Sequence, residues 1–301
     1  MSILFLDCPD DMIGLWQRVS RSDDPPIRVN IANGQPHDVP ALLGGYDICL
    51  NDHTYLNADL LGRCPTLRHI VFLGTGASSF IDLAAAASRD IKVHTIKGYG
   101  DTSVAEHTIA IAMSAARNVA RMDREVRAGR WRQIEGLQLY GKTLGIIGLG
   151  GVGREVARIA LGIGMQVLAW NRSPIAQPPA PLVALEELLR AADIVCVTLA
   201  LNEQTRGFLN HARLSGTKPG MILVNTSRAT IVDLDALIAL LRSGHIRHAA
   251  FDVFAQEPPA RNDPLLAMEN VTLTAHAGFM TPEATMCLLR AAIDLAAATS
   301  A

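Results

Sequence analysis

Residues 142–157 read KTLGIIGLGGVGREVA, and this stretch decides the fold of the chain. An apolar run precedes the pattern GxGxxG at Gly148, Gly150 and Gly153, and a helical pattern over residues 154–161 follows it. In that context Gly148 permits a tight turn, Gly150 lets the backbone approach a pyrophosphate, and Gly153 lets the helix pack close to the strand. The stretch therefore predicts a strand, turn and helix that hold a dinucleotide at the helix N-terminus. The alternative is a glycine-rich turn without a ligand.

Short apolar runs alternate with helical patterns on both sides of the glycine motif. The predicted strands lie at residues 2–6, 48–50, 69–72 and 92–95 before the motif, and at 143–148, 166–170, 193–198, 221–225, 248–253 and 271–274 from it onward. Apolar strands separated by helices indicate parallel sheets covered on both faces. We expect two α/β domains, joined by a helix over 103–127, with a final helix over 282–298 that packs back on the first domain.

Composition and charge exclude several classes of protein. The 301 residues are 49% hydrophobic and 19% charged, which is typical of globular chains with a large core. The formal net charge of -2 gives no support for nucleic-acid binding, and the sequence has no uncharged apolar run of about 18 residues that could span a membrane. The five cysteines are scattered and the first residues lack a basic signal region, so we expect reduced thiols in a cytoplasm. No His, Cys and Asp cluster has metal-ligand spacing, so no metal is expected.

The residues after the second strand of the glycine unit bear on the choice of cofactor. An NAD site normally places an acidic residue about 20 positions beyond the glycines, where it binds the ribose 2′-hydroxyl. Here no acidic residue occurs between Glu155 and Glu186, and the strand is followed by Asn171, Arg172 and Ser173. Because a guanidinium pairs well with phosphate, we predict that NADP(H) is preferred and NAD(H) remains possible. The alternative is that Arg172 is a solvated loop charge.

Three ionisable residues follow successive late strands of the same predicted sheet. Arg228 comes after the strand at 221–225, Glu257 after the strand at 248–253, and His276 after the last strand. Residues beyond the carboxyl ends of parallel strands line the ligand crevice of an open α/β sheet. We therefore expect these three side chains to converge beside the cofactor, although each could instead be a structural or solvated residue.

Several separated motifs, in this order, resemble the D-isomer-specific 2-hydroxyacid dehydrogenase family. They are VAEHT at 104–108, GKTLGIIG at 141–148, the glycine pattern, Asn225 with Arg228 and IVD at 231–233, DVF at 252–254 with EP at 257–258, and AH at 275–276 with Gly278. The resemblance implies two doubly wound parallel-sheet, Rossmann-like domains, with the nucleotide domain inserted into a discontinuous catalytic domain. It places the catalytic domain at 1–100 plus 277–301 and the dinucleotide-binding domain at 101–276.

The resemblance also assigns roles to individual residues. His276 would be the acid/base that gives a proton to the carbonyl oxygen of a small 2-oxoacid, a role that suits an imidazole near neutral pH. Glu257 would orient His276 and favour its protonated form, and Arg228 would grip the substrate carboxylate. His276 and Arg228 would then also bind substrate, together with the loop Leu73, Gly74, Thr75 and Gly76.

Further residues would touch the cofactor by the same resemblance. Gly151 and Val152 would donate backbone N–H groups to the pyrophosphate, and Asp252 would lie near the nicotinamide carboxamide or its ribose. The remaining positions in this group are Leu199, Ala200, Thr205, Thr226, Ser227 and Gly278. His107, in the VAEHT motif, is read as a packing residue or a domain-interface bond. The resemblance further implies a homodimer built around the nucleotide domain, with the helix at 104–116 and the loop near Trp131 in the interface.

The sequence departs from the family pattern in places that bear on substrate choice. The stretch 76–82 lacks the usual Asp after the glycines, and Ala200, Ala275, Ala229 and Gly100 stand where other residues are usual. None of these changes removes a proton-transfer group. The leading hypothesis is an NADPH-preferring reductase of a small 2-oxoacid, or the reverse dehydrogenase. The alternatives are a phosphoglycerate-type dehydrogenase and a non-catalytic nucleotide-sensing protein on the same scaffold.

Overall fold

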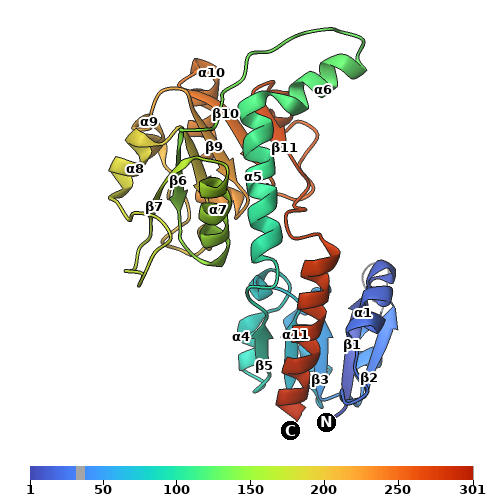
Figure 1. Ribbon diagram of the computed structural model, residues 1–301. Helices are drawn as coiled ribbons and strands as arrows, with labels where there is room; N and C mark the ends of the chain where they lie inside the picture. Colours follow the sequence, from blue (N-terminus) through green and yellow to red (C-terminus); the bar gives the residue numbers. More distant parts are fainter. Residues whose placement is uncertain (32–37, 301) are drawn as a thin grey trace. The chain divides into compact units, whose positions relative to one another are not determined.

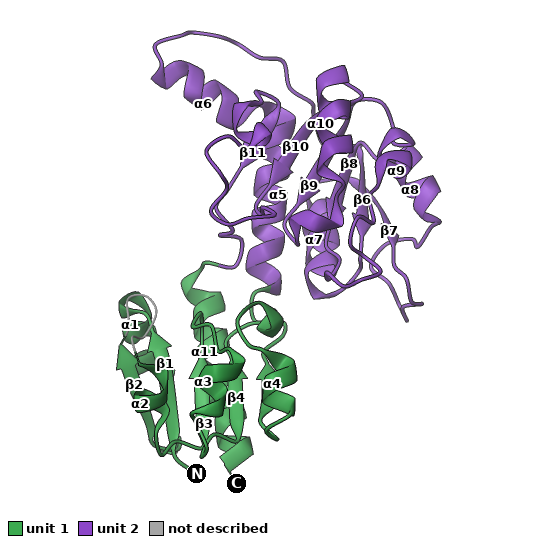
Figure 2. Cartoon of the chain, turned by 180° about the vertical axis from the view of Figure 1, so that it is seen from behind, with its two compact units in different colours: residues 1–100, 280–301 green, residues 101–279 purple. Residues whose placement is uncertain are grey.

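The computed structural model describes residues 1–31 and 38–300, which form two compact units. Unit 1 comprises Met1–Gly100 and Met280–Ala301, and unit 2 comprises Asp101–Phe279 (Figure 2). Each unit contains one parallel sheet with helices on its faces. The predicted fold class, with one α/β domain inserted into another, is confirmed. Among the described helices, none is long and apolar enough to cross a membrane.

Unit 1 has a five-stranded parallel sheet in the order β2-β1-β3-β4-β5. The strands are β1 Ile3–Cys8, β2 Ile27–Ile31, β3 Ile48–Asn51, β4 His69–Phe72 and β5 Lys92–Thr95. The helices are α1 Ile13–Val19, α2 Val39–Leu43, α3 Ala58–Gly62, α4 Leu83–Ala87 and α11 Pro282–Ser300. Leu289 and Ile293 of α11 pack in one apolar cluster with Phe5 and Leu50 (Figure 1). The C-terminal helix therefore forms part of the hydrophobic core of unit 1, together with the first strands of the chain.

Unit 2 has a six-stranded parallel sheet in the order β11-β10-β9-β8-β6-β7. The strands are β6 Thr143–Ile147, β7 Gln166–Trp170, β8 Ile194–Val197, β9 Met221–Asn225, β10 Ile246–Phe251 and β11 Val271–Leu273. Its helices are α5 Asp101–Arg117, α6 Val119–Arg127, α7 Gly151–Gly162, α8 Leu185–Ala191, α9 His211–Ser215 and α10 Leu234–Ser243. Neighbouring residues of each strand alternate between two apolar clusters, which α5 and α7 cover on one face and α8 and α10 on the other.

The elements differ from the predicted ones at three places. The helix predicted over 103–127 is broken at Asn118, whose φ of 56° is left-handed, a conformation that Asn tolerates better than most residues. The apolar pattern of residues 78–88 predicts one helix, but α4 begins only at Leu83, because Ile81 forms a parallel bridge with Leu56. Strand β2 is absent from the predicted strands, because it is a half-exposed edge strand with a weak apolar pattern.

Candidate active site

The glycine turn links β6 to α7 with the geometry that the sequence predicts. Gly148 has a φ of 102°, and a Cβ there would lie 2.9 Å from a methyl carbon of Leu199. A Cβ at Gly153 would overlap the carbonyl oxygen of Gly148, so only glycine lets α7 approach the strand this closely. Gly150 faces open space, which leaves room for a ligand against the backbone. The exposed first turn of this 12-residue helix fits the pyrophosphate of a dinucleotide.

An acidic side chain lies beside the same turn. The carboxylate of Asp101, the first residue of α5, occupies the space that a side chain at Gly151 would need. Burial, and next the charge of Glu155, raise the pKa of this carboxyl. The neighbouring Val152 is half-buried at the start of α7.

The ends of β7 and β8 hold the glycine turn in place. Asn171 accepts a hydrogen bond from the backbone N–H of Leu149 at 3.1 Å and donates one to the carbonyl of Ser173 at 2.8 Å. Thr198, which follows β8, donates to the carbonyl of Gly148 at 2.5 Å. Asn171 therefore supports the turn, while the exposed Arg172 donates to the side chain of Gln204.

The other residues predicted at the cofactor lie along the same edge of the sheet. Thr205 is buried and donates to the carbonyl of Ala200 at 2.8 Å, which closes the loop that begins at Leu199. Thr226 and Thr108 are joined through their hydroxyls at 2.7 Å. Ser227 donates its N–H and hydroxyl groups to Asn225. Their hydroxyls are thus committed to the frame of the site.

The structure brings His276 and Glu257 into direct contact. His276 Nδ1 lies 2.6 Å from Glu257 Oε2, and about a third of each side chain is exposed to solvent. Glu257 Oε1 accepts a hydrogen bond from the backbone N–H of Phe254 at 2.9 Å, which orients the carboxylate. With Nδ1 bonded to the acid, Nε2 is the ring nitrogen left to exchange a proton with a ligand. Such an imidazole–carboxylate pair can act as a general acid or base.

Arg228 follows β9, the strand beside β10, at the same edge of the sheet. Its guanidinium donates to the carbonyl of Ser227 at 2.7 Å, and it forms no ion pair with a carboxylate of the described residues. Asn225 fixes the turn before it by donating to the carbonyl of Arg228 at 3.0 Å. Arg228 is thus a half-buried cation with unused donors, which suits an anionic ligand.

Asp252 is buried and its carboxylate oxygens accept several hydrogen bonds. Oδ1 accepts from the hydroxyl of Thr274 at 2.6 Å and from the N–H of Ala277 at 3.0 Å, and Oδ2 accepts from the N–H of Gly278 at 2.9 Å. Burial alone would raise the pKa of Asp252, but these bonds and one from His107 outweigh it and lower the pKa to about 2. Asp252 is therefore a permanent anion that holds the loop on which His276 lies.

His107 is the residue whose place at this site the sequence did not indicate. Its Nε2 lies 3.0 Å from the hydroxyl of Thr274 and 3.3 Å from Asp252 Oδ1, all within unit 2. The interpretation as packing or a domain-interface bond rested on its position in a helix. The VAEHT motif was the available signal, because it places an ionisable residue on the helix that covers this sheet.

The predicted substrate loop belongs to unit 1 and follows β4. Leu73 is buried and donates its N–H to Asn51 at 2.9 Å, while Gly74 is buried with a φ of 155°. Thr75 is exposed and Gly76 is half-buried. The N–H groups of Thr75 and Gly76 donate to no acceptor among the described residues, so they are available to an anion.

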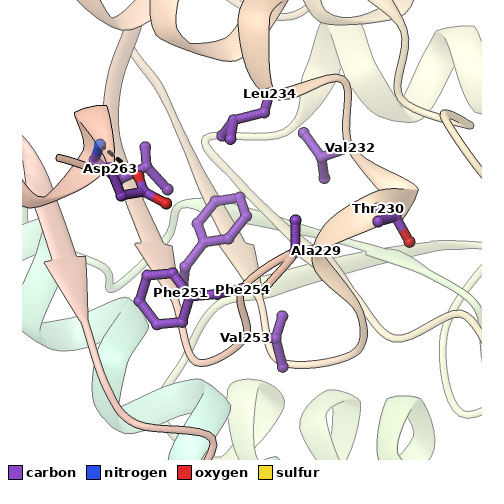
Figure 3. A pocket seen from close by; sticks show the side chains of 10 residues that line it. Ala229, Thr230, Val232, Leu234, Phe251, Val253, Phe254 and Asp263 are labelled. Carbon is purple, nitrogen blue, oxygen red and sulfur yellow. Dashed lines mark hydrogen bonds between the residues drawn. The ribbon is translucent and has the colours of Figure 1, made fainter. Parts of the chain in front are cut away.

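An apolar cavity of about 110 Å³ lies in unit 2 (Figure 3). Its lining comes from the segment after Arg228, from the end of β10 and from residues 263–265, as the side chains of Val232 and Phe251 in Figure 3 show. The lining includes neither the glycine turn nor His276. The cavity therefore does not coincide with the cluster of ionisable groups.

Comparisons with known proteins agree with this geometry. Residues 109–278 match the family described as D-isomer specific 2-hydroxyacid dehydrogenase, NAD binding domain. The chain is 35% identical over 243 residues to D-3-phosphoglycerate dehydrogenase of Archaeoglobus fulgidus, covering 79% of this chain and 46% of that protein. It is 38% identical over 241 residues to glyoxylate reductase of Aeropyrum pernix, covering 76% and 72%.

The fold matches a solved structure over its whole length. The apo-structure of D-lactate dehydrogenase from Escherichia coli aligns with a TM-score of 0.87 and 25% identity, covering 100% of this chain and 97% of that one. The chain spans only about half the length of the phosphoglycerate dehydrogenase that it matches. It belongs to the D-isomer-specific 2-hydroxyacid dehydrogenase family.

Proposed function

We propose that the chain is a reductase of small 2-oxoacids that prefers NADPH, or the dehydrogenase of the corresponding D-2-hydroxyacids in the reverse direction. The observation that carries this proposal is the contact between His276 and Glu257 at the carboxyl edge of the sheet that also bears the glycine turn. An acid/base pair and a dinucleotide turn on one sheet edge suit a reaction that moves a hydride and a proton together.

The proposed chemistry uses the protein for proton transfer and charge stabilisation. The glycine turn before α7 would hold NADPH, which would supply the hydride for the carbonyl carbon of the oxoacid. His276 Nε2 donates a proton to the carbonyl oxygen, so the product is a neutral hydroxyl group, and Glu257 stabilises the imidazolium before transfer and orients the ring. In the reverse direction the same nitrogen accepts the hydroxyl proton.

Arg228 is proposed to hold the substrate by its carboxylate. Its free N–H donors match a planar 2-oxoacid, whose carboxylate and carbonyl oxygens can both accept hydrogen bonds from one guanidinium. The loop from Leu73 to Gly76 in unit 1 is also proposed to bind substrate, through the N–H groups of Thr75 and Gly76, which donate to no acceptor among the described residues. The substrate and catalytic domain would then be 1–100 with 277–301, and the dinucleotide domain 101–276.

Cofactor preference is proposed to depend on Arg172, with Asn171 and Ser173 beside it. Arg172 is exposed at the end of β7, where a 2′-phosphate would lie, and Gln204 holds its guanidinium. The test is the ratio of kcat/KM for NADPH to that for NADH in the wild type and in Arg172→Ala. We expect the ratio to fall roughly 10- to 100-fold in the variant, the range of one lost guanidinium–phosphate pair. A wild type that prefers NADH would contradict the proposal.

A homodimer built on unit 2 is proposed from its exposed apolar residues. Helix α6 has no buried residue, and Val119 and Val126 on it are each 53% exposed. In the segment that follows, Trp131 is 86% exposed and Tyr140 is 72% exposed. Figures 1 and 2 both show α6 and this segment extending away from the sheet of unit 2. Light scattering after gel filtration should give twice the chain mass, and Trp131→Glu should lower it.

The activity is tested with purified protein, NADPH and a panel of glyoxylate, hydroxypyruvate, pyruvate, phenylpyruvate and phosphohydroxypyruvate. Loss of NADPH absorbance reports reduction. The last substrate tests the phosphoglycerate-type alternative, which the Archaeoglobus relative favours. His276→Ala should lower kcat by roughly three orders of magnitude while NADPH still binds. Full activity of this variant would refute the proposed mechanism. If the wild type reduces none of these substrates, the result would favour a nucleotide-sensing role for this protein, which we propose is cytoplasmic.

A further inference from the structure

His107 lies next to the proposed catalytic residues but has no part in the mechanism above. It is on α5, and its side chain reaches the loop after β11 through Thr274 and Asp252. Its side chain is 22% exposed, and that of Asp252 is 2% exposed. A histidine so placed can be a simple packing residue, or it can fix the loop that it contacts.

The hydrogen-bond donors at this contact can be assigned from chemistry. Thr274 Oγ1 has one proton, and its shortest contact is 2.6 Å to the carboxylate of Asp252, which is ionised at neutral pH. The oxygen of Thr274 therefore accepts from His107, and Asp252 can only accept. His107 Nε2 must carry a proton, and this one N–H lies within reach of both acceptors.

The residue whose carboxylate receives these bonds, Asp252, also accepts hydrogen bonds from the backbone around His276. Residues 276, 277 and 278 all donate their N–H groups to Asp252, the first to its carbonyl at 2.7 Å and the others to its side chain. A Cβ at Gly278 would lie 3.1 Å from Asp252 Oδ2, so glycine allows this close approach. Within the same turn His276 has a φ of 53°, which is left-handed. The backbone carbonyl and the carboxylate of Asp252 together thus hold the turn against a local backbone cost.

We propose that His107 is a positioning residue for the reduction: through Thr274 and Asp252, its Nε2–H holds the turn 274–278 in the conformation that presents His276. The kinetic part of this proposal rests on the proposed function, but the structural part does not. Removing the N–H leaves Asp252 and Thr274 with one donor fewer, so the turn loosens and His276 spends less time in its reactive orientation.

The experiment compares His107→Met with His107→Gln. The two side chains are similar in length, but only Gln has an N–H donor near the position of Nε2. In His107→Met we expect amide hydrogen exchange at 276–278, measured without cofactor, to rise roughly tenfold or more. We expect kcat to fall roughly 10- to 100-fold while KM and the Kd of NADPH stay within about twofold. His107→Gln should recover most of both losses.

His248 provides a matched control. Its Nε2 lies 2.9 Å from the hydroxyl of Thr272 in β11, so it too contacts a threonine hydroxyl, but no carboxylate takes part. His248→Met should change neither exchange at 276–278 nor kcat per NADPH-binding site. Thr274→Val provides a second variant if His107→Met does not fold, and it should loosen the turn in the same way.

Each outcome decides the proposal. Faster exchange together with lower kcat, both restored by Gln, supports it. Unchanged exchange, a fall in kcat without faster exchange, or faster exchange with unchanged kcat would each overturn it. If the protein reduces no oxoacid, the proposed function fails, and the exchange data still show whether His107 holds the turn.

Discussion

Asp252→Asn is the substitution whose effect can be worked out most directly from the structure. The carboxylate has a pKa of about 2 instead of 3.8, because hydrogen bonds from His107, Thr274 and two backbone N–H groups outweigh its burial. At about 1.4 kcal/mol per pKa unit, the ionised side chain stabilises the folded state by about 2 kcal/mol at neutral pH. Asn keeps one acceptor oxygen but turns an NH₂ group toward donors, which costs about 1–3 kcal/mol more.

The pH dependence of this effect has a definite sign. Because the folded pKa lies below the unfolded one, the stabilisation is complete above pH 3.8 and is lost as the pH falls through about 2. Asn does not titrate, so the difference in unfolding free energy between wild type and Asp252→Asn should be largest at pH 7. It should shrink by about 1 kcal/mol at pH 3.

Urea titrations followed by tryptophan fluorescence measure this difference, since Trp131 and Trp170 both lie in unit 2. Asp235→Asn is the control, because Asp235 is exposed in the first turn of α10 and its loss should change stability little at either pH. A difference between wild type and Asp252→Asn that stays constant from pH 7 to pH 3, or widens as the pH falls, would refute the reasoning.

The remaining predictions concern the substrate and cofactor residues. Glu257→Gln should lower kcat roughly 10- to 100-fold, because the imidazolium loses its charged partner, while NADPH affinity measured by fluorescence stays the same. Arg228→Lys should raise the KM of the oxoacid roughly tenfold or more, since an ammonium cannot bind it bidentately; an unchanged KM would place the carboxylate elsewhere. Gly153→Ala should lose both NADPH binding and stability, because the added carbon overlaps the carbonyl of Gly148. Gly150→Ala should keep its melting temperature but weaken NADPH binding, since the added carbon meets no protein atom within 4 Å and would enter the space proposed for the cofactor.

The sequence predicted those features that depend on short stretches of chain. The glycine turn follows from Gly148 and Gly153, whose neighbours along the chain already define the strand and the helix. The contact of His276 with Glu257 follows from strand ends that lie at one edge of a parallel sheet, together with the family resemblance. In both cases the periodicity of neighbouring residues identifies a strand or a helix. The geometry of a parallel sheet then places the residues that follow each strand at one edge of the sheet.

Features that depend on tertiary contacts were not predictable from the sequence. The break at Asn118 coincides with contacts to a later segment, because Leu137 donates an N–H to the carbonyl of Ala116 and the Asn118 side chain donates to the carbonyl of Glu135. The bond between His107 and Thr274 joins residues 167 positions apart, and it depends on how α5 packs against β10 and β11. Helical periodicity shows which side of α5 is apolar, but not which polar group the helix carries to the sheet edge.

The conformation of His276 explains why so many donors meet at Asp252. A left-handed φ at a non-glycine residue costs roughly 1–3 kcal/mol, so it persists only where the surroundings determine it more strongly than local preference does. The N–H group of His276 bonds the carbonyl of Asp252, and those of Ala277 and Gly278 bond its carboxylate, so one buried residue determines the backbone of this turn. A glycine at position 276 would adopt this backbone without strain but would have no imidazole. The chain therefore keeps a strained histidine at the position that we propose for proton transfer, and the hydrogen bonds that meet at Asp252 offset the strain.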